Sequence, residues 1–310
     1  MSVRRAPLRW ACAVALVAWA PAFGPARLHA ASEPATSALA VSSTPQPIQI
    51  PSRDGTLISG WWLRADESAL GATASGARGV VIALHGCGGL YAAGREQAGQ
   101  LTQRHGGLAR RLRAEGWHVV LPDSLTARGE RSLCEQRIGQ RKVVQRHRRD
   151  DVLGTLQWLK QQPWADASRV ALVGWSHGGS AVLAATDLRD SAVRDAAVRP
   201  STAIAFYPGC SEALRAGYQP SAPLLMLVGE KDDWTPAEPC VRLAAATGTQ
   251  VTVYPDSHHG FDNPVGSVRH LPNVPNGANP GQGVHAGRNP VTGPQAWNDA
   301  IARLREAFAR

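Results

Sequence analysis

The pentapeptide GWSHG at residues 174–178 places a serine where nucleophilic catalysis could occur. It completes a G-x-S-x-G pattern that follows the apolar run RVALV and precedes a segment rich in Ala and Leu. In that context the serine occupies a sharp strand-to-helix turn, and its flanking glycines let neighbouring backbones pack closely. The backbone N–H of His177 would point at the oxyanion formed when Ser176 attacks a carbonyl. The pattern therefore predicts a nucleophile at Ser176 rather than a structural Gly-Ser turn.

A serine hydroxyl needs a general base that is itself held by an acid, and candidates for both follow Ser176. Asp232 and Asp233 come directly after the apolar run LLMLV, in GEKDDWTP, and position alone allows either to be the acid. His258 and His259 follow the run VTVY, and either could be the base. The two histidines could instead bind a metal ion, but no third ligand stands at zinc-like spacing nearby. We therefore expect an acid–base pair, with no metal ion and no organic cofactor.

A glycine-rich turn, HGCGG at residues 85–89, follows the apolar run VVIAL. Such a turn at the end of a buried strand can direct a second backbone N–H at the oxyanion. Its three glycines permit the unusual dihedral angles that this requires. The alternative is an ordinary strand-to-helix turn, but three glycines in four residues after a histidine favour the functional interpretation. We therefore interpret the turn as functional.

These segments belong to a repeating pattern of strands and helices. Continuous or alternating apolar runs predict strands at 48–50, 57–63, 80–84, 119–121, 170–173, 203–207, 224–228 and 250–254. Helical spacing predicts helices at 101–115, 143–161, 177–186, 236–246 and 295–308. This alternation is typical of the α/β class, with a mainly parallel sheet, helices on both faces and function at the carboxyl ends of the strands. Residues 262–291 are rich in Gly, Pro and Asn and are expected to form a long loop that either covers the site or hangs free.

The first 45 residues differ in composition from the rest. Residues 1–30 combine three early arginines, an apolar stretch and the sequence LHA before Ala31, which predicts a signal peptide rather than an uncleaved membrane anchor. Residues 31–45 are rich in Ala, Ser, Thr and Pro and predict a disordered tether, so the catalytic domain would span residues 46–310. Export implies a periplasmic or secreted protein, with no stable membrane partner.

The positive charge of the chain does not by itself indicate a nucleic-acid partner. Lys and Arg exceed Asp and Glu by 9, and removing the four arginines of residues 1–30 lowers this excess to 5. Much of the remainder lies in RKVVQRHRR at 141–149, which we interpret as the solvated face of a helix because no nucleic-acid-binding motif accompanies it. We expect a small-molecule substrate and no nucleic-acid partner.

The motifs taken together resemble the dienelactone hydrolase family of α/β-hydrolases. The resemblance covers roughly residues 47–262 and rests on the order and spacing of HGCGG, PDSLTARG, VGWSHGG, FYPGC, GEKDDWTP and YPDSHHGF. It implies the α/β-hydrolase fold with a mainly parallel eight-stranded sheet. It also implies that Asp232 is the acid, that His259 is the base, and that the oxyanion donors are the backbone N–H groups of Cys87 and His177.

The chain departs from the enzymes that give this family its name. They use a cysteine nucleophile where this chain has Ser176, and a glutamate where it has Gly86. Hydrolysis of carboxylic esters or lactones through an acyl-serine is therefore the expected reaction. A serine peptidase of the same fold is the alternative, and a non-catalytic binding protein is a third reading that the complete set of residues disfavours.

The cysteines predict disulfides if the domain is exported. Cys87, Cys134, Cys210 and Cys240 lie outside the expected signal peptide, and four cysteines allow three pairings. The strand order of the resembled fold implies the pairs Cys87–Cys134 and Cys210–Cys240.

Five further side chains flank the catalytic segments. The aromatic residues among them would line the cleft or pack in the core, and the arginine would bind an acidic substrate or form a structural salt bridge. They are Tyr91, Trp175, Trp234, Phe261 and Arg128.

Overall fold

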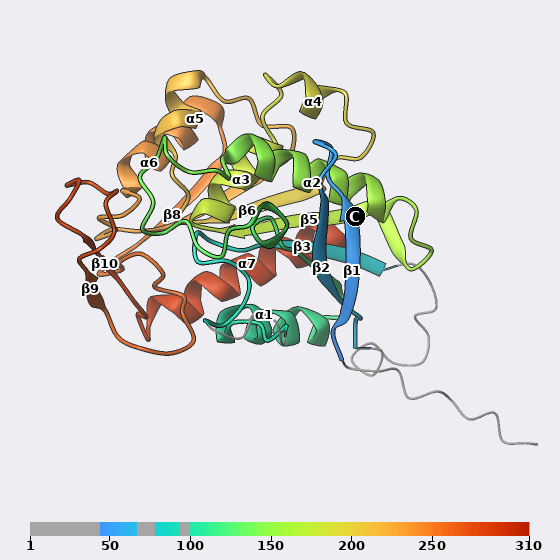
Figure 1. The fold of residues 1–310 in the computed structure, drawn as a ribbon, viewed down its shortest axis with the longest axis horizontal. Helices are drawn as coiled ribbons and strands as arrows, with labels where there is room; N and C mark the ends of the chain where they lie inside the picture. Colours follow the sequence, from blue (N-terminus) through green and yellow to red (C-terminus); the bar gives the residue numbers. More distant parts are fainter. Residues whose placement is uncertain (1–43, 67–77, 94–98, 310) are drawn as a thin grey trace, which may run out of the picture. The chain divides into compact units, whose positions relative to one another are not determined.

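The computed structural model describes residues 44–66, 78–93 and 99–309, which contain an eight-stranded sheet with helices on both faces (Figure 1). The strands are β1 (Gln46–Pro51), β2 (Leu57–Leu63), β3 (Arg78–Leu84), β4 (His118–Pro122), β5 (Ala165–Trp175), β6 (Thr202–Phe206), β7 (Leu224–Gly229) and β8 (Gln250–Tyr254). Their order is β1-β2-β4-β3-β5-β6-β7-β8. Strands β3 to β8 pair in parallel, whereas β2 is antiparallel to both β1 and β4. The predicted α/β class and mainly parallel sheet are confirmed.

Helices cover the two faces of the sheet in separate groups (Figure 1). Helices α1 (Gln103–Ala114) and α7 (Thr292–Phe308) pack on one face, and α2 (Gln145–Leu159), α3 (His177–Ala185) and α6 (Ala237–Thr247) pack on the other. Short helices α4 (Ser191–Arg194) and α5 (Ser211–Ala216) and a 3-10 turn at Thr126–Arg128 lie in the connections. The five long helices were predicted, but α4 and α5 were not, because so few residues show no helical periodicity.

Strand β3 shows why a buried strand reads as an unbroken apolar run. Val80, Ile82 and Leu84 belong to the hydrophobic cluster that contains α2 and α3, whereas Val81 and Ala83 belong to the cluster with α1 and α7. Successive side chains of a strand point to opposite faces, so a strand covered on both sides needs apolar residues at every position. The segment that ends at the HGCGG turn is thereby held rigidly at the centre of the sheet.

The long segment at 262–291 is not entirely a loop. It contains β9 (Arg269–Leu271) and β10 (Val284–Ala286), which pair as an antiparallel two-stranded sheet. The expected long loop thus contains two strands that were not predicted, because strands of three residues are too short to produce an alternating pattern. We refer to residues 262–291 as the hairpin segment.

The N-terminal predictions fall largely on residues that the structure does not describe. The expected signal peptide at 1–30 and most of the expected tether at 31–45 lie outside the described residues. Over the described ranges, none of the helices has the length and apolar character needed to span a bilayer.

Candidate active site

Ser176 occupies a strained turn between β5 and α3. Its backbone has φ 54° and ψ −116°, a conformation that a residue with a side chain rarely adopts. Close packing makes the two flanking glycines necessary. A Cβ atom on Gly178 would lie 2.1 Å from the carbonyl oxygen of Leu84, and one on Gly174 would lie 2.2 Å from that of Gly178. The G-x-S-x-G pattern is therefore a consequence of backbone packing at this turn.

Three of the predicted site residues form one hydrogen-bonded chain. His259 Nε2 lies 2.9 Å from Ser176 Oγ, and His259 Nδ1 lies 2.9 Å from Asp232 Oδ2. The carboxylate of Asp232 is fully buried and the imidazole is almost so, with side-chain exposures of 0% and 6%. Ser176 follows β5, Asp232 follows β7 and His259 follows β8, so parallel pairing brings all three to one edge of the sheet.

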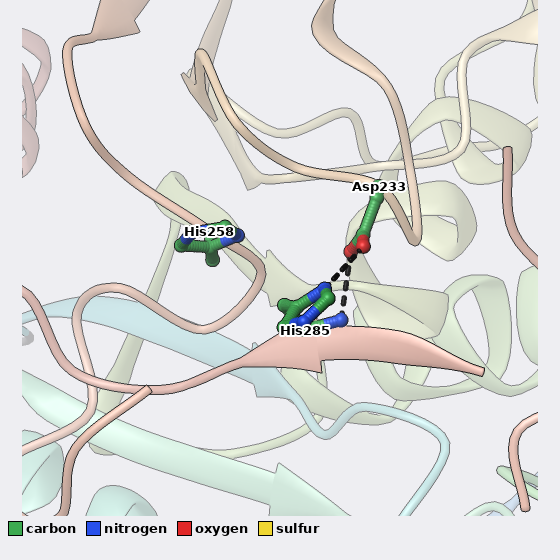
Figure 2. A group of neighbouring side chains, drawn as sticks. All are labelled: Asp233, His258 and His285. Carbon is green, nitrogen blue, oxygen red and sulfur yellow. Dashed lines mark hydrogen bonds and ion pairs between the residues drawn. The ribbon is translucent and has the colours of Figure 1, made fainter. Parts of the chain in front are cut away.

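The neighbouring candidates lie elsewhere. Asp233 Oδ2 hydrogen-bonds His285 Nδ1 at 2.7 Å rather than His259 (Figure 2). His258 Nδ1 is buried without a hydrogen-bond partner among the described residues. The structure thus places Asp232 and His259 beside Ser176, as the family resemblance implied.

Asp232 is held by the turn that follows it. The backbone N–H groups of Trp234 and Thr235 donate to Oδ1 at 2.9 and 2.8 Å. The Thr235 hydroxyl lies 3.1 Å from both Asp232 Oδ2 and His259 Nδ1, and it donates to the carbonyl oxygen of Tyr207 at 3.0 Å. Sequence reasoning did not identify Thr235. Its place three residues after the candidate acid, directly before a proline, was the available signal.

The HGCGG turn packs against the serine. A Cβ atom on Gly86 would lie 3.4 Å from the carbonyl oxygen of Trp175 and 3.6 Å from Ser176 Cβ. Cys87 and Ser176 border the same cavity, and His177 begins α3 directly after the serine. The two backbones expected to supply oxyanion donors are therefore adjacent to Ser176.

Arg148, which was not predicted as a site residue, connects these two turns. Its side chain is fully buried, donates from Nη2 to the His85 carbonyl at 2.9 Å, and places Nη1 3.2 Å from His177 Nδ1. Burial lowers the pKa of Arg148 to about 10, so it remains charged at neutral pH. Burial and this charge together hold the pKa of His85 and of His177 well below the usual range. The interpretation of RKVVQRHRR as a solvated helix face is therefore wrong for Arg148, which anchors the site.

A cavity of about 920 Å³ opens above Ser176 and His259. Its lining includes the turns at Cys87, Ser176 and His259, and it also includes the hairpin segment, with residues 263–267, 269, 271–274, 286 and 287. The segment is tied to the base, because Gly287 N–H donates to the His259 carbonyl at 2.9 Å. The segment was expected either to cover the site or to hang free, and the second alternative is wrong, because the segment lines the cavity.

The aromatic residues near the site divide between wall and core. Trp234 lines the cavity and contacts the His259 ring at a centroid distance of 4.6 Å. Trp175 also borders the cavity, but it is 1% exposed and donates from Nε1 to Asp262 at 2.9 Å. Phe261 is buried in the core. Tyr91 is half-buried, and its hydroxyl accepts a hydrogen bond from a tryptophan on β2.

Arg128 forms a structural salt bridge. Its guanidinium donates to both carboxylate oxygens of Asp151 at 2.9 and 2.8 Å, and to Asp54 at 2.8 Å. This arrangement ties the loop after β4 to α2 and to the β1–β2 turn. The alternative in which Arg128 binds an acidic substrate is not supported by these contacts.

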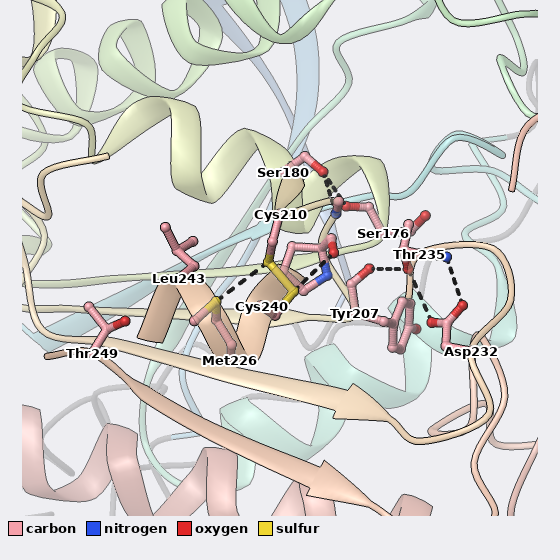
Figure 3. The surroundings of a disulfide bond; sticks show 12 residues. Ser176, Ser180, Tyr207, Cys210, Met226, Asp232, Thr235, Cys240, Leu243 and Thr249 are labelled. Atoms are coloured by element: carbon pink, nitrogen blue, oxygen red, sulfur yellow. Dashed lines mark hydrogen bonds between the residues drawn. A yellow bond between two sulfur atoms is a disulfide. The ribbon is translucent and has the colours of Figure 1, made fainter. Parts of the chain in front are cut away.

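Two disulfides tie together segments near the site. Cys87–Cys134 ties the HGCGG turn to the loop after β4, and Cys210–Cys240 ties the start of α5 to α6. Figure 3 shows the second bond beside the segment that contains Tyr207, whose carbonyl contacts Thr235. Both expected pairings are thus present in the structure. A disulfide in an oxidising compartment stabilises a domain by about 2–4 kcal/mol.

Known proteins place this architecture in a family. The fold resembles a proposed dienelactone hydrolase from Klebsiella pneumoniae (17% identity, TM-score 0.58, covering 84% of this chain and 98% of that one). It also resembles a dienelactone hydrolase-like promiscuous phosphotriesterase from metagenomic libraries (20% identity, TM-score 0.57, covering 85% of this chain and 99% of that one). A Mycobacterium tuberculosis puromycin-hydrolyzing peptidase matches over 71% of this chain but 36% of its own (16%, TM-score 0.54). No curated protein sequence matches significantly. The profile of the dienelactone hydrolase family matches residues 79–307, and the chain therefore belongs to the dienelactone hydrolase family of α/β-hydrolases.

Proposed function

We propose that this chain hydrolyses carboxylic esters or lactones through an acyl-serine intermediate. The observation that carries the proposal is the hydrogen-bonded chain from Asp232 through His259 to Ser176, with both contacts at 2.9 Å. Nucleophile, base and acid in this order and geometry are the arrangement by which a serine hydroxyl becomes reactive. Membership of a hydrolase family supports the same conclusion.

In the first step, Ser176 Oγ attacks the acyl carbonyl while His259 Nε2 takes the hydroxyl proton. Asp232 keeps the remaining ring proton on Nδ1 and stabilises the imidazolium that forms. The oxyanion accepts hydrogen bonds from the backbone N–H groups of Cys87 and His177, which Arg148 holds in register through their turns. The imidazolium then protonates the leaving alkoxide, which departs as the alcohol.

In the second step, a water molecule reaches the acyl-serine from the cavity. His259 removes a proton from this water as its oxygen attacks the acyl carbon, and the same oxyanion donors act again. Collapse of the intermediate returns the proton to Ser176 Oγ and releases the carboxylic acid. All groups in both steps come from the protein, and the proposal requires no metal ion or organic cofactor.

The decisive experiment compares substrate classes at one site. We expect turnover of p-nitrophenyl esters, measured over a series of rising acyl length beside simple lactones and peptide p-nitroanilides. Hydrolysis of the anilides alone would instead indicate the peptidase reading. A fluorophosphonate probe distinguishes an enzyme from a binding protein, because it labels a reactive serine. If the folded protein were not labelled at Ser176, a non-catalytic protein would be indicated.

The Cys87–Cys134 disulfide gives a prediction about rate as well as stability. We expect the Cys87→Ser/Cys134→Ser double variant to lose about 2–4 kcal/mol of stability and to show a kcat about 10- to 100-fold lower. The loss of rate would follow because the backbone N–H of residue 87 is then less well positioned for the oxyanion. Thermal unfolding and esterase kinetics at 15 °C would measure the two effects.

The other disulfide provides the matched control. The Cys210→Ser/Cys240→Ser variant should lose comparable stability, because its closed loop is of similar length (30 against 47 residues of separation). Its kcat should fall less, because neither cysteine belongs to an oxyanion turn. Equal rate losses in the two variants would contradict the proposed role of the residue 87 backbone.

We also propose that the domain is exported and acts on a small molecule. Residues 1–30 have the composition of a signal peptide, and two disulfides are compatible with an oxidising compartment. The proposal includes no nucleic-acid or stable membrane partner. Mass spectrometry of the protein from a periplasmic or culture-medium fraction would show whether its N-terminus begins near Ala31.

A further inference from the structure

Three metal-ligating side chains come together beside the proposed catalytic residues without taking part in their hydrogen-bonded chain. Asp233 follows the proposed acid, His258 precedes the proposed base, and His285 lies on β10 of the hairpin segment. Figure 2 shows these side chains converging from three different parts of the chain. Sequence reasoning rejected a metal site because it found no third ligand close to the histidine pair. The fold supplies that ligand from the hairpin segment.

We propose that Asp233, His258 and His285 bind a zinc ion, and that the bound ion fastens the hairpin segment to the loops carrying the proposed acid and base. One potential ligand atom from each residue lies within 4.8 Å of the other two. Ligands about 2.0–2.1 Å from a tetrahedral ion are about 3.4 Å apart. Small side-chain rotations would give this spacing, with Asp233 Oδ2 and His285 Nδ1 moving apart from their 2.7 Å contact as the ion replaces their hydrogen bond. Two imidazoles and a carboxylate are a donor set that zinc accepts readily.

The hydrogen bonding of His258 is a second, independent indication. Its Nδ1 atom is buried and has no hydrogen-bond partner within the described part of the chain. A buried polar atom left unpaired is costly, so native structures almost always pair such atoms with protein, water or an ion. By contrast, both ring nitrogens of the adjacent His259 are occupied by Ser176 and Asp232. Nδ1 of His258 is thus available to bind an ion, whereas neither ring nitrogen of His259 is.

The other two ligands are accessible and already aligned. Asp233 and His285 side chains are 32% and 47% exposed, so an ion can enter and keep a water molecule as its fourth ligand. Asp233 Oδ2 and His285 Nδ1 lie 2.7 Å apart, and Asp233 Oδ1 accepts the backbone N–H of His285 at 2.8 Å. This second contact fixes the approach of β10 to the carboxylate.

The position of the ion determines its effect. Ala286, next to His285, forms a β-bridge with His259, and the Asp233 carbonyl accepts the N–H of Ala278 at 2.8 Å. A zinc ion would therefore cross-link the hairpin segment to the loops that carry Asp233 and His258, close to places where the segment already contacts those loops. Because the site lies outside the chain of Ser176, His259 and Asp232, the ion acts as a structural fastening and takes no part in bond cleavage.

Zinc binding by untagged, chelator-treated protein tests the proposal. Calorimetric titration with zinc chloride should give one ion per chain, and zinc at about 100 times its Kd should raise Tm by about 5–10 °C. Cobalt(II) should produce the visible absorption of a tetrahedral site. His285→Ala should abolish stoichiometric binding and the rise in Tm. Absence of one-to-one binding in the unmodified protein, or unchanged binding in His285→Ala, would overturn the proposal.

A neighbouring histidine supplies the matched control. His270 lies on β9, is exposed, and has its ring centroid 5.0 Å from that of His285, but its Nε2 contacts the Gln282 carbonyl at 2.8 Å. His270→Ala should retain zinc binding, and loss equal to that of His285→Ala would contradict the three-residue site. The Ser176→Ala protein should bind zinc as the unmodified protein does. Zinc binding is therefore tested independently of the proposed hydrolase activity, and failure of one proposal would not imply failure of the other.

Discussion

Ser176→Ala is expected to lower kcat for p-nitrophenyl esters by about a million-fold while leaving the fold intact. The substitution removes the only atom that bonds to the acyl carbon, and residual turnover would come from the oxyanion donors and the cavity alone. Alanine meets the same backbone strain at φ 54° as serine does, so stability should change little. Burst and steady-state kinetics would measure the rate, and circular dichroism with thermal unfolding would measure the fold.

Ser180 is the matched control for this variant. It lies one turn further along α3, where its hydroxyl accepts the N–H of Gly209 at 2.9 Å. Ser180→Ala loses a hydroxyl of the same kind four residues further along the chain, and its kcat should stay within about tenfold of the unmodified protein. Full esterase activity in Ser176→Ala would refute the assignment of the nucleophile.

Asp232→Asn is expected to lower kcat by about 10⁴-fold at neutral pH. The hydrogen-bond donors around residue 232 determine the orientation of the side-chain amide in this variant. The N–H groups of Trp234 and Thr235 require an acceptor at the Oδ1 position, so the amide nitrogen must face His259 Nδ1. A donor there forces the ring proton onto Nε2, where the imidazole can no longer accept the Ser176 proton. Steady-state kinetics of the purified variant would measure the loss.

Asp233→Asn is the control, because it makes the same change at the neighbouring position. Its carboxylate bonds His285 rather than His259, so kcat should remain within about tenfold when zinc is absent. A large loss in Asp233→Asn together with a small loss in Asp232→Asn would reverse the proposed assignment of the acid.

The sequence predicted the sheet and the turn at residue 176 because both depend on neighbouring residues. Apolar runs between polar turns indicate strands that are buried on both faces of the sheet. Strand β3 confirms this, because its successive side chains alternate between the two hydrophobic clusters. The glycines at 174 and 178 are required because neighbouring backbone atoms lie too close to leave room for a side chain. The choice of Asp232 over Asp233, and of His259 over His258, needed the family resemblance, because adjacent residues share the same local pattern.

Contacts made by polar residues across the fold could not be predicted in the same way. Arg148 sits in a run of basic residues whose composition indicates exposure to solvent, yet its side chain is buried in contact with His85 and His177. Thr235 looks like an ordinary residue before a proline until the Tyr207 carbonyl and the Asp232 carboxylate are seen around it. The partners of Arg148 lie on elements far away in the sequence. Those of Thr235 come together only when the turn after Asp232 has folded against Tyr207.

The sequence by itself determined that this protein has an α/β sheet, a serine at a strained strand-to-helix turn, and acid and base candidates in the right order. Those features are local, since they follow from side-chain periodicity and from backbone geometry within a few residues. Only the tertiary structure decided that the hairpin segment lines the cavity and that Arg148 connects the turns at His85 and His177. It also brought His285 to Asp233 and His258. These outcomes depend on which distant segments the strand order brings together, and no pattern within a short window of sequence contains that information.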